Sequence, residues 1–224
     1  MAEGQDKARA LQEIPRFKVV DPQAQPLGEW PDEELMLAHG DGLEQAFAEL
    51  LARHQRGVLN YTYRMVQNRQ IAEELTQEVF LALVKNGQRY TPTAKFTTYL
   101  YAIASNVVYK EWTRQKRRIK PFSLSSWWFS RGDADEFNPL EHLGDEQADV
   151  LAAFQRGEIS EAVNAALKHL PDHQREAFVL RRFQDLSYAE IAEILEVPVG
   201  TVKSRVVRAE RALRPYLERY REYV

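Results

Sequence analysis

Six residues near the C-terminus carry side chains that could read DNA bases. They are cationic or hydroxylic and recur within eleven positions: Thr201, Lys203, Ser204, Arg205, Arg208 and Arg211. Arginine and lysine are suited to the O6 and N7 acceptors of guanine in the major groove. Basic faces are also common on solvated helices, so these charges alone leave both interpretations open.

The surrounding stretch, residues 187–213, predicts two short helices joined by a tight turn. Ser187 followed by Glu190 forms a capping box, which marks the start of the first helix. Pro198 disfavours helix in the residue before it and separates the two segments. Apolar residues then follow a helical period: Tyr188, Ile191, Ala192 and Leu195 in the first segment, and Val199, Val202, Val206, Ala209 and Leu213 in the second.

The six candidate residues fall outside the apolar face of the second segment. A short helix, a tight turn and a longer helix with a basic outer face form the helix-turn-helix layout, whose second helix enters the major groove. Glu196 occupies a turn position where glycine is common because the backbone there tends toward positive φ. Glutamate can adopt this conformation at a modest cost, so the turn remains compatible with the motif.

A second candidate region runs from Phe96 to Arg118 and combines aromatic side chains with cations. A core stripe is predicted at Leu100, Ile103, Ala104, Val107 and Val108, and around it lie Tyr99, Tyr101, Tyr109, Trp112, Arg114, Lys116, Arg117 and Arg118. Rings stack on unpaired bases, contributing about 1–3 kcal/mol per base, while cations hold phosphates. The alternative is that these rings pack into a helical core.

The stretch from Ile71 to Asn86 predicts a third functional surface on one amphipathic helix. Its buried stripe is Ala72, Leu75, Val79 and Leu83, and its outer residues are Glu74, Gln77, Glu78 and Lys85, with Phe80 beside them. A polar face carrying an exposed aromatic is typical of a docking surface. Phe80 could equally belong to the core.

Composition favours a globular protein with segregated charge. The 224 residues are 44% hydrophobic and 28% charged, with a net charge of −3. Residues 95–120 hold seven basic residues and one acidic residue, residues 131–158 hold two basic and eight acidic, and residues 198–221 hold seven basic and two acidic. Two basic blocks around an acidic segment suggest two nucleic-acid contacts and a connector.

The absence of cysteine excludes disulfides and thiolate chemistry in this chain. The first 20 residues lack the apolar region of a signal peptide, and no apolar run approaches a membrane span. These features predict a cytoplasmic protein, and we expect no cofactor and no metal. His54 has polar neighbours and is expected at the surface.

The predicted fold class is all-α, with two small helical domains joined by a flexible acidic linker. Residues 1–31 carry recurrent prolines and are expected to form a mobile N-terminal extension. The first domain spans residues 32–118, with a helix break at His39–Gly42 and a loop from Gly87 to Lys95. The linker spans residues 119–158, and the helix-turn-helix domain spans residues 159–224.

Three segments together resemble bacterial RNA polymerase sigma factors of the extracytoplasmic-function (ECF) group. They are AEELTQEVFLALVKN, FTTYLYAIASNVVYKEWTRQKRR and LPDHQREAFVLRRFQDLSYAEIAEILEVPVGTVKSR. Many repressors contain a helix-turn-helix, so the joint occurrence of both halves in this order carries the resemblance. It covers roughly residues 32–118 and 159–218, which would correspond to sigma regions 2 and 4.

The resemblance implies core RNA polymerase and promoter DNA as partners, and it also admits an anti-sigma factor. Polymerase docking would involve Glu74, Gln77, Glu78 and Phe80. The −10 element would be melted, and its single strand bound, by Tyr90, Lys95, Phe96, Tyr99, Asn106, Arg114 and Arg117. Flipping a base costs a few kcal/mol, which a pocket and a stacking surface would offset. The six C-terminal residues would read the duplex −35 element.

Three positions depart from the usual sigma pattern: Tyr99 in place of tryptophan, Ala102 in place of arginine and Lys110 in place of an acidic residue. They bear on the −10 sequence preference.

The linker length agrees with the implied function. The two promoter elements lie about two helical turns of about 34 Å apart, and forty residues extend to at most about 130 Å.

Two other classes of function are compatible with parts of the sequence. A helix-turn-helix regulator that works without polymerase would usually dimerise, because one recognition helix reads only a half-site, and the sequence shows no dimerisation heptad. An enzyme such as a recombinase would need a nucleophile with supporting groups or a carboxylate metal cluster. The five histidines are scattered and the sequence shows neither arrangement.

Overall fold

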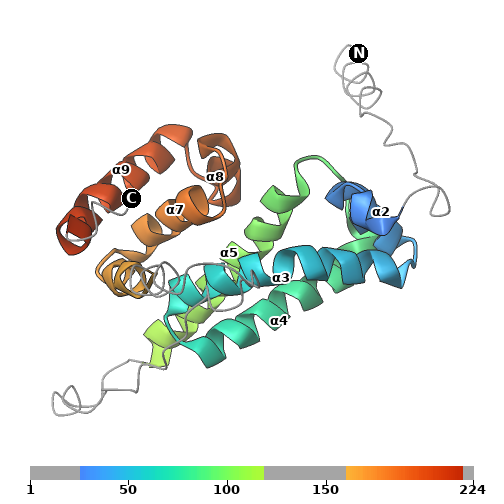
Figure 1. The fold of residues 1–224 in the computed structure, drawn as a ribbon, viewed down its shortest axis with the longest axis horizontal. Helices are drawn as coiled ribbons and strands as arrows, with labels where there is room; N and C mark the ends of the chain where they lie inside the picture. Colours follow the sequence, from blue (N-terminus) through green and yellow to red (C-terminus); the bar gives the residue numbers. More distant parts are fainter. Residues whose placement is uncertain (1–25, 119–159, 219–224) are drawn as a thin grey trace, which may run out of the picture.

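The structure, a computed structural model, describes residues 26–118 and 160–218, and every regular element within these ranges is helical. The helices form two groups that lie side by side, one drawn in blue to green and the other in orange to red (Figure 1). The all-α class is therefore confirmed. The acidic linker and residues 1–25 of the predicted extension lie outside the described residues.

The N-terminal group is a bundle in which α3 packs on α2, α4 and α5. Its helices are α2 (Asp32–Gly40), α3 (Glu44–Val66), α4 (Arg69–Asn86) and α5 (Phe96–Arg118), with short 3-10 turns η1 (Leu27–Glu29) and η2 (Gly87–Arg89). The predicted helix break occurs at the end of α2, and α5 has the predicted bounds. Fully buried side chains such as Leu50, Leu83 and Leu100 form the core.

Residues 26–31 belong to this bundle, so their assignment to a mobile extension was wrong. Trp30 is only 4% exposed. Arg53 donates hydrogen bonds to the backbone oxygens of Leu27 (3.0 Å), Gly28 (2.8 Å) and Trp30 (2.7 Å). One guanidinium thus satisfies three carbonyls, which fixes this proline-flanked segment without any helical period in its sequence.

His54 is half-buried, which corrects its expected place at the surface. Its Nε2 lies 2.7 Å from Oδ2 of Asp32, and its ring centroid lies 5.2 Å from that of Phe96. Burial opposes the charge of Asp32, but hydrogen bonds from His54 and Arg53 outweigh it and lower the pKa of this carboxyl. Through this pair, α2 is bound to α3 close to Phe96, the first residue of α5.

The C-terminal group contains the predicted helix-turn-helix. Residues 160–167 are helical and precede α7 (Asp172–Phe183), α8 (Tyr188–Ile194) and α9 (Val199–Leu217). The capping box is confirmed, because the backbone N–H of Glu190 donates to Ser187 Oγ and the backbone N–H of Ser187 donates to Glu190 Oε2. Glu196 in the turn has a φ of 52°, the conformation expected there.

The predicted apolar face of α9 is buried except at its first residue. Val202, Val206, Ala209 and Leu213 are buried, whereas Val199 is 39% exposed. Val199 begins the helix, where the chain has only just left the turn. The two helical groups also contact each other, with α7 against α3 and α8 against α5, an arrangement that the sequence did not predict.

We expect Trp30→Ala to destabilise the protein by about 3–5 kcal/mol, because the substitution empties a buried site of a large side chain. Urea unfolding followed by circular dichroism measures this loss. Tyr109→Ala is the matched control, since Tyr109 is 67% exposed and such surface changes usually stay within about 0.5 kcal/mol. If Trp30→Ala and the wild type were equally stable, residues 26–31 would belong to the N-terminal extension and not to the bundle.

The capping box should also give a pH-dependent stability. Hydrogen bonds from Ser187 and then Lys95 lower the pKa of Glu190 to about 2. Because the pKa in the folded protein lies below the ordinary glutamate value of 4.5, the stabilisation is present above that value and is lost as the pH falls toward 2.

Glu190→Gln preserves a side-chain acceptor for the cap but removes the charge. We expect the wild type to be more stable than this variant by at most about 1 kcal/mol near neutral pH, since the group is partly solvated. The difference should shrink below pH 4.5 in urea titrations at stepped pH. A difference that is constant from neutral pH down to about 2 would contradict the assignment.

Candidate nucleic-acid interface

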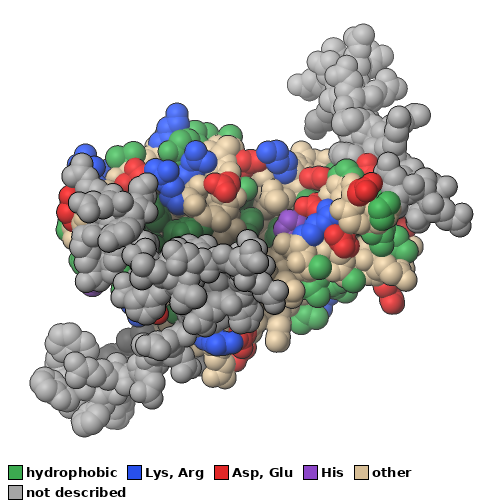
Figure 2. Space-filling view, viewed as in Figure 1, with side chains coloured by type: hydrophobic (Ala, Val, Ile, Leu, Met, Phe, Trp, Pro, Cys, Tyr) green, Lys and Arg blue, Asp and Glu red, His purple; other side chains and the backbone are tan. Residues whose placement is uncertain are grey.

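The second helix of the helix-turn-helix, α9, presents a basic outer face. Lys203, Arg208 and Arg211 are exposed, and Thr201, Ser204 and Arg205 are partly buried. Figure 2 shows Lys and Arg side chains gathered over this part of the molecule. The buried apolar face described above holds α9 against α7 and α8, which leaves the basic face directed outward.

The partly buried members of the set are occupied within the protein. Ser204 Oγ donates to the backbone oxygen of Thr201 at 2.9 Å, a bond that one rotation of the hydroxyl would release. Arg205 lines a cavity of about 1020 Å³ between the two helical groups. Among the six candidate residues, the exposed cations are therefore Lys203, Arg208 and Arg211.

Tyr90 and Phe96 are buried, so their predicted direct contacts with −10 DNA do not hold in this conformation. Tyr90 is 8% exposed and Phe96 is 1% exposed. The ring centroid of Tyr90 lies 5.0 Å from that of Tyr99 and 6.4 Å from that of Phe96. The loop that precedes α5 folds back over the core because burial of these rings removes apolar area from water. The buried rings support the accessible surface of α5 and its loop from inside the bundle.

The N-terminus of α5 is held by a residue from α2. Oε1 of Glu33 accepts a hydrogen bond from the backbone N–H of Phe96 at 2.7 Å. A carboxylate at this end of a helix satisfies a free N–H and interacts favourably with the helix dipole. This contact fixes where the loop of residues 90–95 meets α5. It could not be predicted from local sequence patterns, because the two residues lie in separate helices.

The remaining predicted −10 residues lie on accessible parts of α5 and its loop. Asn106, Lys95, Arg114 and Arg117 are exposed and Tyr99 is partly buried. Lys95 pairs with Glu190 at 2.9 Å, and Arg114 pairs with Glu111 at 2.6 Å. Lys95 is 74% exposed, so it can exchange this partner for phosphate at small cost. Glu111 is only 4% exposed, so moving Arg114 to a phosphate would leave a buried carboxylate without its cation.

The aromatic residues of α5 divide between the core and the surface. Tyr101 and Trp112 are 5% and 9% exposed and belong to the interior, as one of the two interpretations held. Tyr109 is 67% exposed, so the interpretation that these rings pack into the core does not hold for it. It follows directly after the buried pair Val107 and Val108, so its helical position turns it outward.

The outer face of α4 is polar as predicted, but its apolar centre is a different residue. Glu74, Gln77 and Glu78 are exposed. Phe80 is 7% exposed and packs near Phe47, so its predicted place on the docking face was wrong. Exposed apolar surface comes instead from Leu81 (56%) and Val84 (43%).

Helical spacing contains the signal for this face. Leu81 lies seven, four and three residues after Glu74, Gln77 and Glu78, which places all four on one side of α4. Phe80 instead adjoins the buried stripe through Val79 and Leu83.

The described residues contain no cluster of acidic, histidine or cysteine side chains that could hold a metal ion. None of the helices within residues 26–118 and 160–218 is long and apolar enough to cross a bilayer.

Two stretches of the chain match known sequence families. Residues 50–118 match "Sigma-70 region 2" and residues 160–213 match "Sigma-70, region 4". The sigma-H factor of RNA polymerase from Pseudomonas aeruginosa is 31% identical over 190 residues, covering 83% of this chain and 95% of that protein. The ECF sigma factor SigW of Bacillus subtilis is 30% identical over 176 residues, covering 79% of this chain and 91% of that protein.

Two solved structures share this fold. CnrH, solved in complex with the cytosolic domain of CnrY, superposes with a TM-score of 0.58 at 20% identity, covering 84% of this chain and 97% of that chain. RpoE of Bartonella quintana, solved with the anti-sigma factor NepR, gives a TM-score of 0.57 at 22% identity over 77% of this chain and 96% of that chain.

The order of the two matched regions and the length of the shared sequence agree with the helices described above. The family consists of sigma factors, which are not enzymes in their own right. The chain belongs to the ECF RNA polymerase sigma factors, and it is an alternative sigma factor that directs RNA polymerase to promoters.

Proposed function

We propose that this sigma factor divides promoter recognition among three surfaces, each formed by one helix. The outer face of α4 docks on core RNA polymerase, α5 and its preceding loop bind the opened −10 strand, and α9 reads the duplex −35 element. Residues 26–118 would form the region 2 domain, residues 119–158 the linker, and residues 159–224 the region 4 domain.

The observation that carries the proposal is the geometry of α8 and α9. The capping box at Ser187 begins the short helix α8, and the left-handed turn at Glu196 leads from it into α9, the order of elements in a helix-turn-helix. Lys203 and Arg208 lie on the exposed side, opposite buried Val202 and Val206. Exposed cations on the second helix suit guanine acceptors in the major groove.

The −10 surface is assigned to the exposed residues of α5 and its loop. Asn106 can hydrogen-bond a base edge, Tyr109 presents a ring for stacking, and Arg117 presents a charge for phosphate. Tyr90 and Phe96 support this surface from within. Because melting exposes unpaired bases, a surface that combines an amide, a ring and cations can stabilise the opened strand.

Docking on polymerase is assigned to Glu74, Gln77, Glu78 and Leu81. Leu81 and Val84 add exposed apolar area to a polar helix face, the composition of a protein interface with an apolar centre and a polar rim. The same chain would work in the bacterial cytoplasm, where polymerase and chromosome are found. It would need no catalytic group and no cofactor of its own.

An anti-sigma factor is a further proposed partner. RpoE of Bartonella quintana was solved with one, and CnrH was solved with the cytosolic domain of CnrY. The shared fold means that the same faces of regions 2 and 4 exist in this chain. The proposal concerns the class of partner and not its identity.

We expect Gln77→Ala combined with Leu81→Ala to weaken binding to core polymerase by about tenfold or more, since central interface residues often contribute more than about 1 kcal/mol each. Gel filtration with purified core polymerase measures the complex. Gln55→Ala, an exposed change on α3, is the control and should bind normally. Tight promoter binding without any polymerase complex would instead favour a polymerase-independent regulator.

We expect Arg208→Ala to cost about 1–3 kcal/mol at one base position of the −35 element and to relax the preference there. Arg214→Ala, near the end of α9, should weaken all sequences alike and lower the salt slope by about one, as loss of a phosphate contact does. Transcription from −35 variants that each differ by one base measures both effects. A uniform loss for Arg208→Ala would move this residue to the phosphate class.

A further inference from the structure

The basic outer face of α9 contains one exposed apolar side chain. Val207 is 50% exposed. It lies four residues after Lys203 and four before Arg211, and Arg208 follows it directly. Residues four apart are neighbours on a helix surface, so these three exposed cations surround the valine. Val207 therefore belongs to the face that we assign to the −35 element.

Neither packing nor helix propensity explains an apolar side chain at position 207. The helix is held against α7 and α8 by its other face, whose members are all buried: Val202, Val206, Ala209 and Leu213. Valine is also a weaker helix former than alanine, lysine or arginine, because its branched side chain loses rotamer freedom in a helix. A polar residue at this position would serve the fold at least as well.

The surroundings of Val207 suit a nucleic acid better than another protein. The centre of a protein interface is depleted of charge, whereas this valine has three cations around it. Val199 and Tyr216, the other large apolar residues exposed on α9, lie eight and nine positions away, so they form no continuous patch with it. On α4, by contrast, Leu81 and Val84 are only three positions apart.

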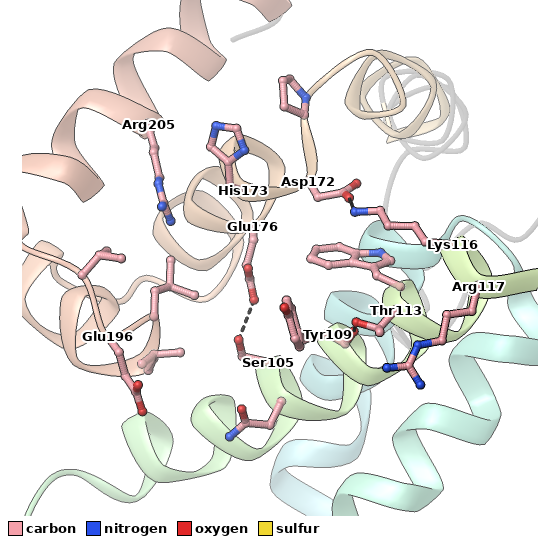
Figure 3. Close-up of a pocket in the computed structure, with 16 residues that line it drawn as sticks. Ser105, Tyr109, Thr113, Lys116, Arg117, Asp172, His173, Glu176, Glu196 and Arg205 are labelled. Carbon is pink, nitrogen blue, oxygen red and sulfur yellow. Dashed lines mark hydrogen bonds and ion pairs between the residues drawn. The ribbon is translucent and has the colours of Figure 1, made fainter. Parts of the chain in front are cut away.

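The neighbouring candidate residues differ in where they point. Arg205 is partly buried and lines the cavity between the two helical groups, and Figure 3 shows it pointing from α9 into that space. The hydroxyl of Ser204 is bonded to the backbone oxygen of Thr201. Val207 and Arg208 are adjacent and both exposed. The middle of α9 thus presents one apolar group and one cation side by side.

Thymine is the base that presents an apolar group in the major groove. Its C5 methyl projects there, whereas adenine, guanine and cytosine present hydrogen-bonding groups at the same edge. Contact between this methyl and the γ methyls of Val207 would remove apolar area on both molecules from water. Cytosine carries an amino donor and no methyl, so a valine can distinguish the two pyrimidines.

We propose that Val207 determines specificity on the −35 surface and that its γ methyls contact the C5 methyl of a thymine. The proposal rests on the assignment of α9 to the duplex −35 element, and it names a base that this element contains. Adjacent Cα atoms lie about 3.8 Å apart, and successive base pairs about 3.4 Å apart. The thymine therefore lies within about two base pairs of the base that Arg208 reads.

Removal of a single methyl group from the DNA tests this contact. Holoenzyme formed with core polymerase first selects promoters from a pool randomised across both elements. Each thymine of the selected −35 element, on either strand, is then replaced singly by deoxyuridine, which lacks only the C5 methyl. We expect wild-type holoenzyme to bind about fourfold more weakly at one of these positions, the factor that corresponds to one buried methyl-sized group. Electrophoretic mobility shifts measure this penalty.

Variants of Val207 show whether the penalty arises at this side chain. Val207→Ala removes the γ methyls and favours the helix, and its deoxyuridine penalty should fall below about twofold. Val207→Ile retains a branched apolar side chain and should keep a penalty close to that of the wild type. Tyr216→Ala is the matched control, because Tyr216 is a 47% exposed apolar residue of the same helix. Its loss should leave the penalty unchanged.

The outcomes separate this proposal from the proposed function. A selected −35 element without thymine, or one in which no deoxyuridine weakens binding, would overturn the methyl contact while leaving α9 as the −35 reader. An equal penalty in the wild type and Val207→Ala would do the same, because thymine would then be read through DNA shape. Holoenzyme that selects promoters without any −35 preference would instead contradict the assignment of α9, and the contact with it.

Discussion

The position of α7 depends on the hydrogen bonds that replace water around the buried Glu176 carboxylate. Burial raises its pKa, and hydrogen bonds from Ser105 and Tyr61, followed by the charge of Arg205, lower it part of the way. A buried carboxylate without such donors would be strongly unfavourable. Because the two hydroxyls come from α3 and α5, the group that needs them can occupy only one position, and it fixes region 4 against both helices.

The chemistry of this contact differs from that of the core within each group. Leu50 and Leu83 lose contact with water on folding and have no polar atom to rehydrate. Tyr61, Tyr101 and Ser105 present hydroxyls at the contact, which can bond to water as readily as to the partner helix. The rings of Tyr61 and Tyr101 are buried as well, so the contact combines apolar area with hydrogen bonds between the two groups.

Much of the fold follows from the sequence because helical periodicity and capping are local. The bounds of α5, the break after α2 and the capping box at Ser187 were predicted from residues within one or two turns. The choice of Phe80 instead of Leu81 on the α4 face failed because both are large, apolar and adjacent. Only the full bundle decides which of them is covered, and the burial of Phe80 beside Phe47 depends on α3.

Contacts between distant residues were beyond the sequence. Tyr61 and Glu176 are 115 positions apart, and Phe96 and Glu33 are 63 apart. Neither pair has a sequence spacing that identifies it as a contact. The segment 26–31 was assigned to the extension for the same reason, since Arg53 lies more than twenty positions beyond the carbonyls that it binds. Sequence reasoning therefore located the helices but did not show how they face one another.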